Sequence, residues 1–150
     1  EAGIITKKCA GKVSELEKLL PIVSSNNSSK LGIGHTRWAT HGIPNTINAH
    51  PHTDSSGKFT LVHNGIIENS VELSSKVSKL GYKLSSETDT EVIVHLLDHE
   101  LKTQPNGKYH LDAFCSVITQ LSGSWAIAVI ASGLDGILIS RKGAPLVIWA

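Results

Sequence analysis

The chain has 150 residues, of which 40% are hydrophobic and 18% charged, a composition that suits one globular domain with a real core. Its formal net charge is only +1 with the histidines neutral, so electrostatics favour neither nucleic acid nor a membrane surface as a partner. Two distant cysteines, Cys9 and Cys115, are too few for a secreted disulfide scaffold, and no apolar run approaches about 18 residues, so we expect a cytoplasmic protein without a membrane span.

The first half of the chain predicts one helix and one clear strand. Residues 11–23 carry leucine and valine at helical spacing. The segment around Ile33 has the character of a buried strand. Residues 58–65 (KFTLVHNG) alternate as a strand does, and this strand is expected to stop at the Asn64-Gly65 pair, because Asn-Gly is a strong turn signal.

The second half predicts three helices followed by strands. The helices are expected at 68–82, 86–101 and 111–121, and the strands at 124–131, 136–143 and 144–150. In the first helix Val71, Val77 and Leu80 form the apolar stripe and Gly81 is the C-terminal cap. In the second, Thr88 or Asp89 is the N-terminal cap. Helices between strands predict an α+β or layered α/β domain, with a sheet packed on helices.

Histidines are concentrated in one stretch, with five of the eight lying between His35 and His63. Their spacing matches no HxxxH or HExxH pattern and no cysteine is nearby, so we expect no metal site. His50 and His52 flank Pro51. They could also be residues of a polar loop without a functional role.

Two other polar features allow a structural and a functional interpretation. Asn64-Gly65 is either a hairpin turn or a pair of donors, a side-chain amide and a backbone N–H, for a developing oxyanion. Asp89 either caps the following helix or binds the ammonium group of a ligand. Arg37 is harder to assign to the core, since an arginine beside Trp38 suits bidentate capture of a carboxylate in a pocket walled by the indole. Together these groups describe a site for an amino acid whose side-chain carbonyl is attacked.

Four motifs occur in a fixed order: GHTRWATHG at 34–42, NAHPH at 48–52, VHNGIIEN at 62–69 and SETDTEVI at 86–93. In this order and spacing they resemble the glutaminase domain of the glucosamine-6-phosphate synthases, or glutamine–fructose-6-phosphate aminotransferases, which are class II glutamine amidotransferases. The resemblance covers essentially the whole chain, since RKGAPLVI at 141–148 also falls where the family has a similar segment. It implies one type-2 glutamine amidotransferase domain over 1–150.

The resemblance implies an N-terminal-nucleophile hydrolase fold, a four-layer αββα sandwich of two antiparallel sheets between helical layers. It also implies a reaction without a cofactor, in which the first residue of the mature protein, a cysteine, attacks the side-chain amide of glutamine with its own α-amino group as base. Ammonia leaves and water releases glutamate. In the whole enzyme, usually a homodimer, the ammonia aminates fructose 6-phosphate on a separate sugar-isomerase domain, a step of hexosamine biosynthesis.

By position, the resemblance implies a role for each motif residue. Asn64 and Gly65 would form the oxyanion hole, Arg37 would bind the α-carboxylate of glutamine and Asp89 its ammonium group. The remaining matches line the substrate pocket: Trp38, Thr40, His41 and His50.

The chain departs from the family at its start. The family begins Cys-Gly-Ile, whereas Glu1 falls inside a later family segment. We therefore expect the nucleophile and the first strand and helix to lie outside these 150 residues, which alone would be inactive. The alternative from another class is a non-catalytic amino-acid-binding or regulatory module on the same fold. The sequence of the HTRWATHG motif argues against an amidotransferase that acts on phosphoribosylpyrophosphate.

Overall fold

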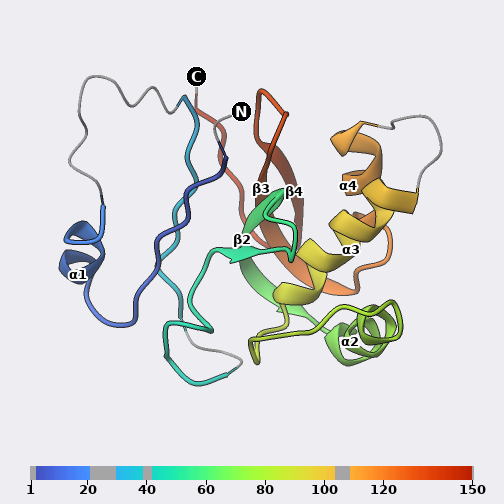
Figure 1. Ribbon diagram of the computed structural model, residues 1–150, viewed down its shortest axis with the longest axis horizontal. Coiled ribbons are helices and arrows are strands. Elements are labelled where there is room, and N and C mark those ends of the chain that lie inside the picture. Colours follow the sequence, from blue (N-terminus) through green and yellow to red (C-terminus); the bar gives the residue numbers. More distant parts are fainter. Residues whose placement is uncertain (1–2, 21–29, 39–41, 104–108, 150) are drawn as a thin grey trace.

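Figure 1 shows the computed structural model, an antiparallel sheet flanked by helices, which describes residues 3–20, 30–38, 42–103 and 109–149. The α+β class expected from the sequence is confirmed. In chain order the elements are α1 (Val13–Glu17), β1 (His52–Thr53), β2 (Phe59–Ile67), α2 (Ser70–Lys79), α3 (Glu91–Thr103), α4 (His110–Ile118), β3 (Gly123–Ala131) and β4 (Leu138–Lys142). None of the helices in these ranges is long and apolar enough to cross a bilayer.

The strands form one antiparallel sheet in the order β1-β2-β3-β4. Its centre is the pairing of β2 with β3, which runs over nine residues of each strand, from Phe59 opposite Ala131 to Ile67 opposite Gly123. The chain between these strands forms α2, α3 and α4, so the pairing is long-range. It fixes where both ends of β2 lie.

The core lies between the sheet and the three helices, which gather on one side of it in Figure 1. Phe59 and Leu61 of β2 and Ile127 and Val129 of β3 pack in this core, and none is more than 1% exposed. Since burying a side chain of this size contributes about 1.5–3 kcal/mol, this interface holds the fold together. The helix α3 is its centre, with every residue from Glu91 to Asp98 buried.

The helices of the second half are confirmed, with one change of face. In α2 the buried residues are Leu73 and Val77, whereas Val71 and Leu80 are 82% and 39% exposed, so the predicted stripe was wrong at both positions. Gly81 follows the helix at φ +90°, and Tyr82 N–H donates to Val77 O at 3.1 Å. This is the bonding of a Schellman motif, which confirms the predicted glycine cap.

Three predictions for strands were wrong, and the first helix is shorter than predicted. No strand forms around Ile33, nor over 144–149. The strand β2 does not stop at Asn64-Gly65 but continues through Ile67. The first helix spans only Val13–Glu17 and buries none of its residues.

The other face of the sheet meets the N-terminal segment, which runs beside residues 30–38 in Figure 1 without regular structure. Thr6 and Thr60 both lie within hydrogen-bonding distance of the Thr53 hydroxyl, at 3.4 and 3.1 Å. Lys8 Nζ donates to the carbonyl oxygens of Ile47 and Ala49 at 2.9 and 3.0 Å. Within the described residues this side carries no second sheet.

Candidate functional site

A cavity of about 140 Å³ lies where β2 passes the loop that precedes α3. Residues far apart in the sequence line it: His35, Arg37, Trp38, His50, His63, Asn64, Gly65, Thr88, Asp89 and Thr90. The structure thus brings together six of the eight predicted site residues. The other two, Thr40 and His41, lie outside the described residues.

Asn64 and Gly65 enter the cavity from within β2, not from a turn. They pair with Ala126 and Trp125 of β3, so the long-range ladder overrides the local turn preference of Asn-Gly. The backbone of Gly65 has φ +126°, a conformation that side chains rarely allow. The side chain of Asn64 is exposed to the cavity side and its Oδ1 lies 2.7 Å from His35 Nε2.

Asp89 is 7% exposed and holds the loop before α3 against β2. Its Oδ2 accepts the backbone N–H of Ile67 at 2.8 Å and its Oδ1 accepts the Thr90 hydroxyl at 3.3 Å. Both bonds of the Asp89 carboxylate go to groups other than the first backbone N–H groups of α3. Asp89 is therefore not the N-terminal cap of this helix. A carboxylate so positioned at a cavity suits a cationic ligand group.

Arg37 places a guanidinium at the same cavity. Its Nη2 donates to Gly42 O at 3.2 Å and its Nη1 to Ile43 O at 3.4 Å. These contacts orient the planar fork, whose five N–H donors match a carboxylate bidentately. Trp38 also lines the cavity but is 88% exposed, so most of its surface faces solvent.

Asn48, which the sequence did not single out as a site residue, anchors the loop that holds Arg37. It is 1% exposed, and its Nδ2 donates to Ile43 O and to a carboxylate oxygen of Glu87, both at 3.0 Å. In return, Glu87 N–H donates to Asn48 Oδ1 at 2.9 Å. The 42–48 loop and the segment leading to Asp89 are therefore one hydrogen-bonded unit. In the sequence, the one sign of a role for Asn48 was its place at the start of the NAHPH motif.

Four histidines cluster at the cavity, of which His35, His50 and His63 line it and His52 lies beside His50. The rings of His35 and His50 stack with centroids 4.3 Å apart, and His52 meets His50 edge-on at 5.0 Å. His50 Nδ1 accepts the backbone N–H of His63 at 3.3 Å. His52 Nε2 lies 3.1 Å from the Thr88 hydroxyl. In the part of the chain that the structure describes, no three His, Cys, Asp or Glu side chains are placed to share a metal ion.

Burial sets the charge of two of these rings. Desolvation, followed by the neighbouring His35, His52 and His63, lowers the pKa of His50 to about 2. Desolvation, followed by the positive charge of Lys8, lowers the pKa of His52 to about 4. Both imidazoles are therefore neutral at pH 7, and Arg37 supplies a positive charge at the cavity.

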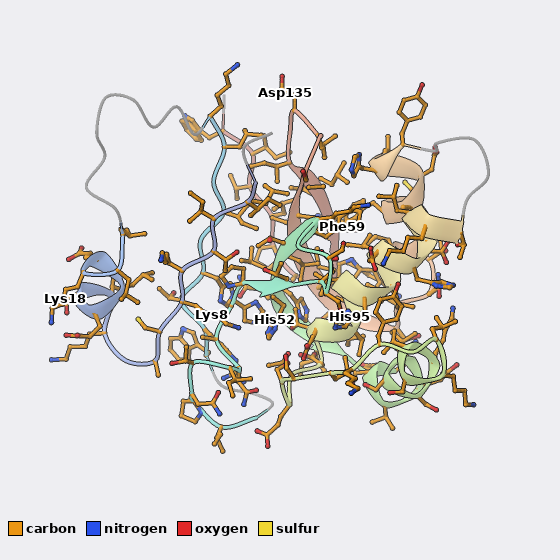
Figure 2. All side chains as sticks on the ribbon, in the orientation of Figure 1. Lys8, Lys18, His52, Phe59, His95 and Asp135 are labelled. Carbon is orange, nitrogen blue, oxygen red and sulfur yellow. The ribbon has the colours of Figure 1, made fainter. Side chains whose placement is uncertain are left out.

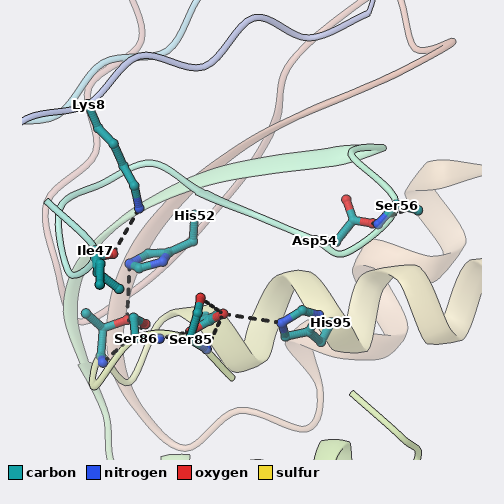
Figure 3. A network of polar contacts seen from close by, with 10 residues as sticks. Lys8, Ile47, His52, Asp54, Ser56, Ser85, Ser86 and His95 are labelled. Carbon is teal, nitrogen blue, oxygen red and sulfur yellow. Dashed lines mark hydrogen bonds and ion pairs between the residues drawn. The ribbon is translucent and has the colours of Figure 1, made fainter. Parts of the chain in front are cut away.

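A second polar network lies beside the cavity, at the start of α3 (Figure 3). The carboxylate of Glu91 accepts from the backbone N–H groups of Ser85 and Ser86, at 3.0 and 2.6 Å, and lies 3.5 Å from His95 Nε2. Burial opposes ionisation, but the bonds from His95 and the serines prevail and hold the pKa of Glu91 well below its ordinary value. His52 and His95 are both buried, at 3% and 2% exposed, and Figure 2 shows both in the interior of the molecule. This network fixes the loop that carries Asp89.

The described cavity lining contains no cysteine. Cys9 lines an adjacent cavity of about 670 Å³, which shares His35, Arg37 and His50 with the first, and Cys115 lies exposed on α4. The arrangement can bind an amino acid through its two charged α-groups and offer donors to an oxygen of its side chain. It does not itself present a thiolate.

Comparison with known proteins agrees with this geometry. A sequence profile described as a glutamine amidotransferase domain matches residues 35–146. The chain belongs to this family. The match spans all the residues that line the cavity.

Relatives of this amidotransferase domain carry one common name. The chain is 48% identical over 149 residues to a glutamine–fructose-6-phosphate aminotransferase (isomerizing) of Pyrococcus horikoshii, covering 99% of this chain and 24% of that protein. It is 46% identical over 143 residues to the protein of the same name from Caulobacter vibrioides, covering 95% of this chain and 22% of that protein. The chain thus spans about a quarter of the length of these relatives.

Among solved structures, a glutamine phosphoribosylpyrophosphate amidotransferase from B. subtilis, complexed with ADP and GMP, is similar at a TM-score of 0.51 and 25% identity. The similarity covers 65% of this chain and 20% of that one. It extends the family likeness from sequence to the arrangement of the sheet and helices.

Proposed function

We propose that this chain is the glutamine-hydrolysing domain of a glutamine–fructose-6-phosphate aminotransferase, a cytoplasmic enzyme of hexosamine synthesis. The observation that carries the proposal is the meeting of Arg37, Asp89 and Asn64-Gly65 at one cavity. A cation, an anion and neutral donors around about 140 Å³ correspond to the carboxylate, ammonium and amide ends of glutamine.

In the proposed reaction each group has one role. Arg37 binds the α-carboxylate through paired N–H···O bonds and Asp89 binds the α-ammonium group. Attack on the side-chain amide carbon turns its oxygen into an oxyanion, to which the Asn64 amide and the Gly65 backbone N–H donate. Trp38, Thr40, His41 and His50 surround the bound glutamine.

The nucleophile is proposed to be an N-terminal cysteine contributed by residues outside these 150, because neither Cys9 nor Cys115 lines the described cavity. Its sulfur bonds to the amide carbon, the thiol proton passes through the α-amine to the departing nitrogen, and ammonia leaves. Water then cleaves the thioester and yields glutamate with the thiol restored. The segment carrying that cysteine would supply the first strand and helix of a four-layer αββα arrangement.

The acceptor of the ammonia is proposed to be fructose 6-phosphate, bound on a sugar-isomerase domain in the rest of the polypeptide, with a homodimer as the assembled form. Support comes from the shared name of relatives that are 43–48% identical to nearly the whole chain. Formation of glucosamine 6-phosphate by the product of the complete gene tests this part. If the protein aminated phosphoribosylpyrophosphate instead, the proposed acceptor would be wrong. The proposal that this domain hydrolyses glutamine would still stand.

The experiment for the glutaminase is a kinetic comparison of variants in the product of the complete gene, with glutamate release as the readout. Arg37→Lys keeps the charge but loses the paired N–H donors, and Asp89→Asn removes the charge. Each weakens a contact worth about 1.5–3 kcal/mol, so KM should rise about 10- to 100-fold. Asn64→Ala removes an oxyanion donor, so kcat should fall about 100- to 1,000-fold.

Matched controls are Arg141→Lys on β4 and Asp135→Asn at the outer tip of the β3–β4 connection, which Figure 2 shows far from the interior histidines. Both are exposed and should leave KM and kcat within about two-fold of the parent. If the complete protein bound glutamine by calorimetry but released no glutamate, the amino-acid-binding module would be the correct function.

A further inference from the structure

We propose that His35 is a positioning residue that acts through Asn64: it holds the Asn64 amide so that its N–H donors face the cavity. This inference rests on the proposed function, in which that amide donates to the oxyanion. The inference adds to the proposed function a residue that acts on the reaction through another side chain.

The contact that carries the proposal is the one between His35 Nε2 and Asn64 Oδ1, at 2.7 Å. An asparagine amide has an oxygen that only accepts and a nitrogen that only donates, on opposite arms of a planar group. Once the oxygen is bonded to His35, the nitrogen must occupy the other arm. Because both residues line the same cavity, a flipped amide would present an oxygen to the oxyanion and repel it.

This bond also assigns the proton on the imidazole. Since Asn64 Oδ1 can only accept, His35 Nε2 must carry the hydrogen. His35 Nδ1 is buried and has no hydrogen-bond partner among the described residues. The one described hydrogen bond of the His35 ring is therefore the bond to Asn64. Removing the imidazole should affect Asn64 first.

The ring of His35 is held in its plane by His50. The two rings stack at 4.3 Å with an interplanar angle of 26°. His50 in turn accepts the backbone N–H of His63, the residue that precedes Asn64 in β2. Both ends of the stack are thus tied to the same strand.

The arrangement is needed because His35 comes from a segment without regular structure. Residues 30–38 make no strand with the sheet, so no ladder of backbone hydrogen bonds sets their distance from β2. The His35–Asn64 bond joins residues 29 positions apart. It links the loop that carries Arg37 to the strand that carries the oxyanion donors.

The test uses the product of the complete gene and three substitutions at one position. His35→Phe keeps a flat ring on His50 but has no donor, so kcat for glutamate release should fall about 10- to 100-fold, part of the effect of deleting an oxyanion donor. KM and the Kd for L-glutamate, measured by calorimetry, should stay within about three-fold, because Arg37 and Asp89 are untouched. His35→Gln carries an amide N–H near the place of Nε2 and should recover most of kcat, whereas His35→Ala should not.

A double-mutant cycle separates positioning from general damage. In an Asn64→Ala background, His35→Phe should lower kcat by less than about two-fold, because the group it positions is gone. His99→Phe is the control: His99 lies on α3 against Tyr82 and should change neither kcat nor Tm.

Three results would overturn the inference: His35→Phe with kcat within two-fold of the parent, full additivity in the cycle, or a fall in Tm and in L-glutamate binding parallel to kcat. The last would make His35 merely structural. If Asn64→Ala lowers kcat while His35→Phe does not, only this inference fails. If the parent protein releases no glutamate, the proposed function fails and this inference falls with it.

Discussion

His52 has lost the pH response that free histidine shows near neutrality, because it is 3% exposed and hydrogen-bonded to Thr88. Its neighbour His50 is in the same situation, with the ring of His35 stacked on it and the ring of His52 meeting it edge-on. For both, burial is the main cause of a pKa below the ordinary 6.5. An imidazole that must stay neutral in the folded state makes the fold sensitive to acid.

We therefore expect the free energy of unfolding to decrease as the pH falls from about 6.5 toward 4. The pKa values of His50 and His52 are about 2 and about 4 in the fold against 6.5 in the unfolded chain, so the unfolded state binds more protons throughout this interval. The contribution of each neutral ring to the free energy of unfolding is present above pH 6.5 and decreases below it. At pH 5 the loss is about 2 kcal/mol for each ring. Urea titrations at pH 7 and pH 5 measure this loss.

The buried carboxylates lose their contribution to the free energy of unfolding in a lower pH range than the histidines. The effect of the histidines can therefore be measured separately. Glu91 and Asp98 also have lowered pKa values, but their windows open only below the unfolded values of 4.5 and 3.8. His52→Gln should remove about half of the loss between pH 7 and pH 5, and His99→Gln should remove none. An unchanged pH slope in His52→Gln would contradict the prediction.

Among the elements, β2 depends on a residue without a side chain. A Cβ added at Gly65 would lie 2.1 Å from the carbonyl oxygen of Ser124 on β3, and the backbone there has φ +126°. The two strands cannot keep their register around such a contact.

Gly65→Ala should accordingly lower the free energy of unfolding by more than about 3 kcal/mol, through overpacking and backbone strain together. Gly57→Ala is the matched control. It also has positive φ, +69°, but nothing lies within 4 Å of its Cβ position, so it should cost about 1–2 kcal/mol. Equal losses in urea titrations of the two variants would show that the contact with Ser124 is relieved cheaply.

The start of α3 depends on the charge of Glu91. It is 4% exposed, and its carboxylate accepts from Ser85 and Ser86 and lies 3.5 Å from His95 Nε2. It also lies in the first helical turn, where the helix dipole favours a negative charge.

Glu91→Gln keeps the shape but removes the charge and turns one acceptor into a donor, so we expect a loss of about 2–3 kcal/mol in the free energy of unfolding. Glu72→Gln makes the same change in the first turn of α2, at an exposed position, and should cost less than about 1 kcal/mol. Thermal unfolding of both variants at pH 7 compares them. A Glu91 loss no larger than that of Glu72 would mean that the buried network is replaceable.

At the scale of the molecule, stability is distributed unevenly between the two sides of the sheet. The helix side contains the continuous core of α2, α3, α4, β2 and β3. On the other side α1 buries no residue, and Ile5 is 72% exposed. Figure 1 shows α1 standing apart from the sheet and the other helices.

Hydrogen exchange should follow this division. Amides of α3 and of the β2–β3 pairing should exchange only through global unfolding, whereas those of α1 should exchange through local opening, at least about 1,000-fold faster. Exchange followed by mass spectrometry on the product of the complete gene measures both groups in one experiment. Protection of α1 equal to that of α3 would show that α1 packs on a part of the protein outside these residues.

The sequence by itself determined the elements whose cause is local. The helices α2, α3 and α4 follow from apolar spacing within a few turns, and the Gly81 cap from a backbone conformation that glycine adopts freely. The motifs around Arg37, Asn64 and Asp89 were sufficient to indicate the family, because they are short and ordered.

Only the tertiary structure decided what depends on distant partners. The Asn64-Gly65 pair favours a turn locally, yet pairing with Ala126 and Trp125 makes it the interior of a strand. The bond of His35 to Asn64 and that of Asn48 to Glu87 join residues 29 and 39 positions apart. Periodicity reports only on neighbours along an element, whereas these contacts form once the whole chain has closed on its core, which is why the sequence proposed the site residues but not the groups that hold them.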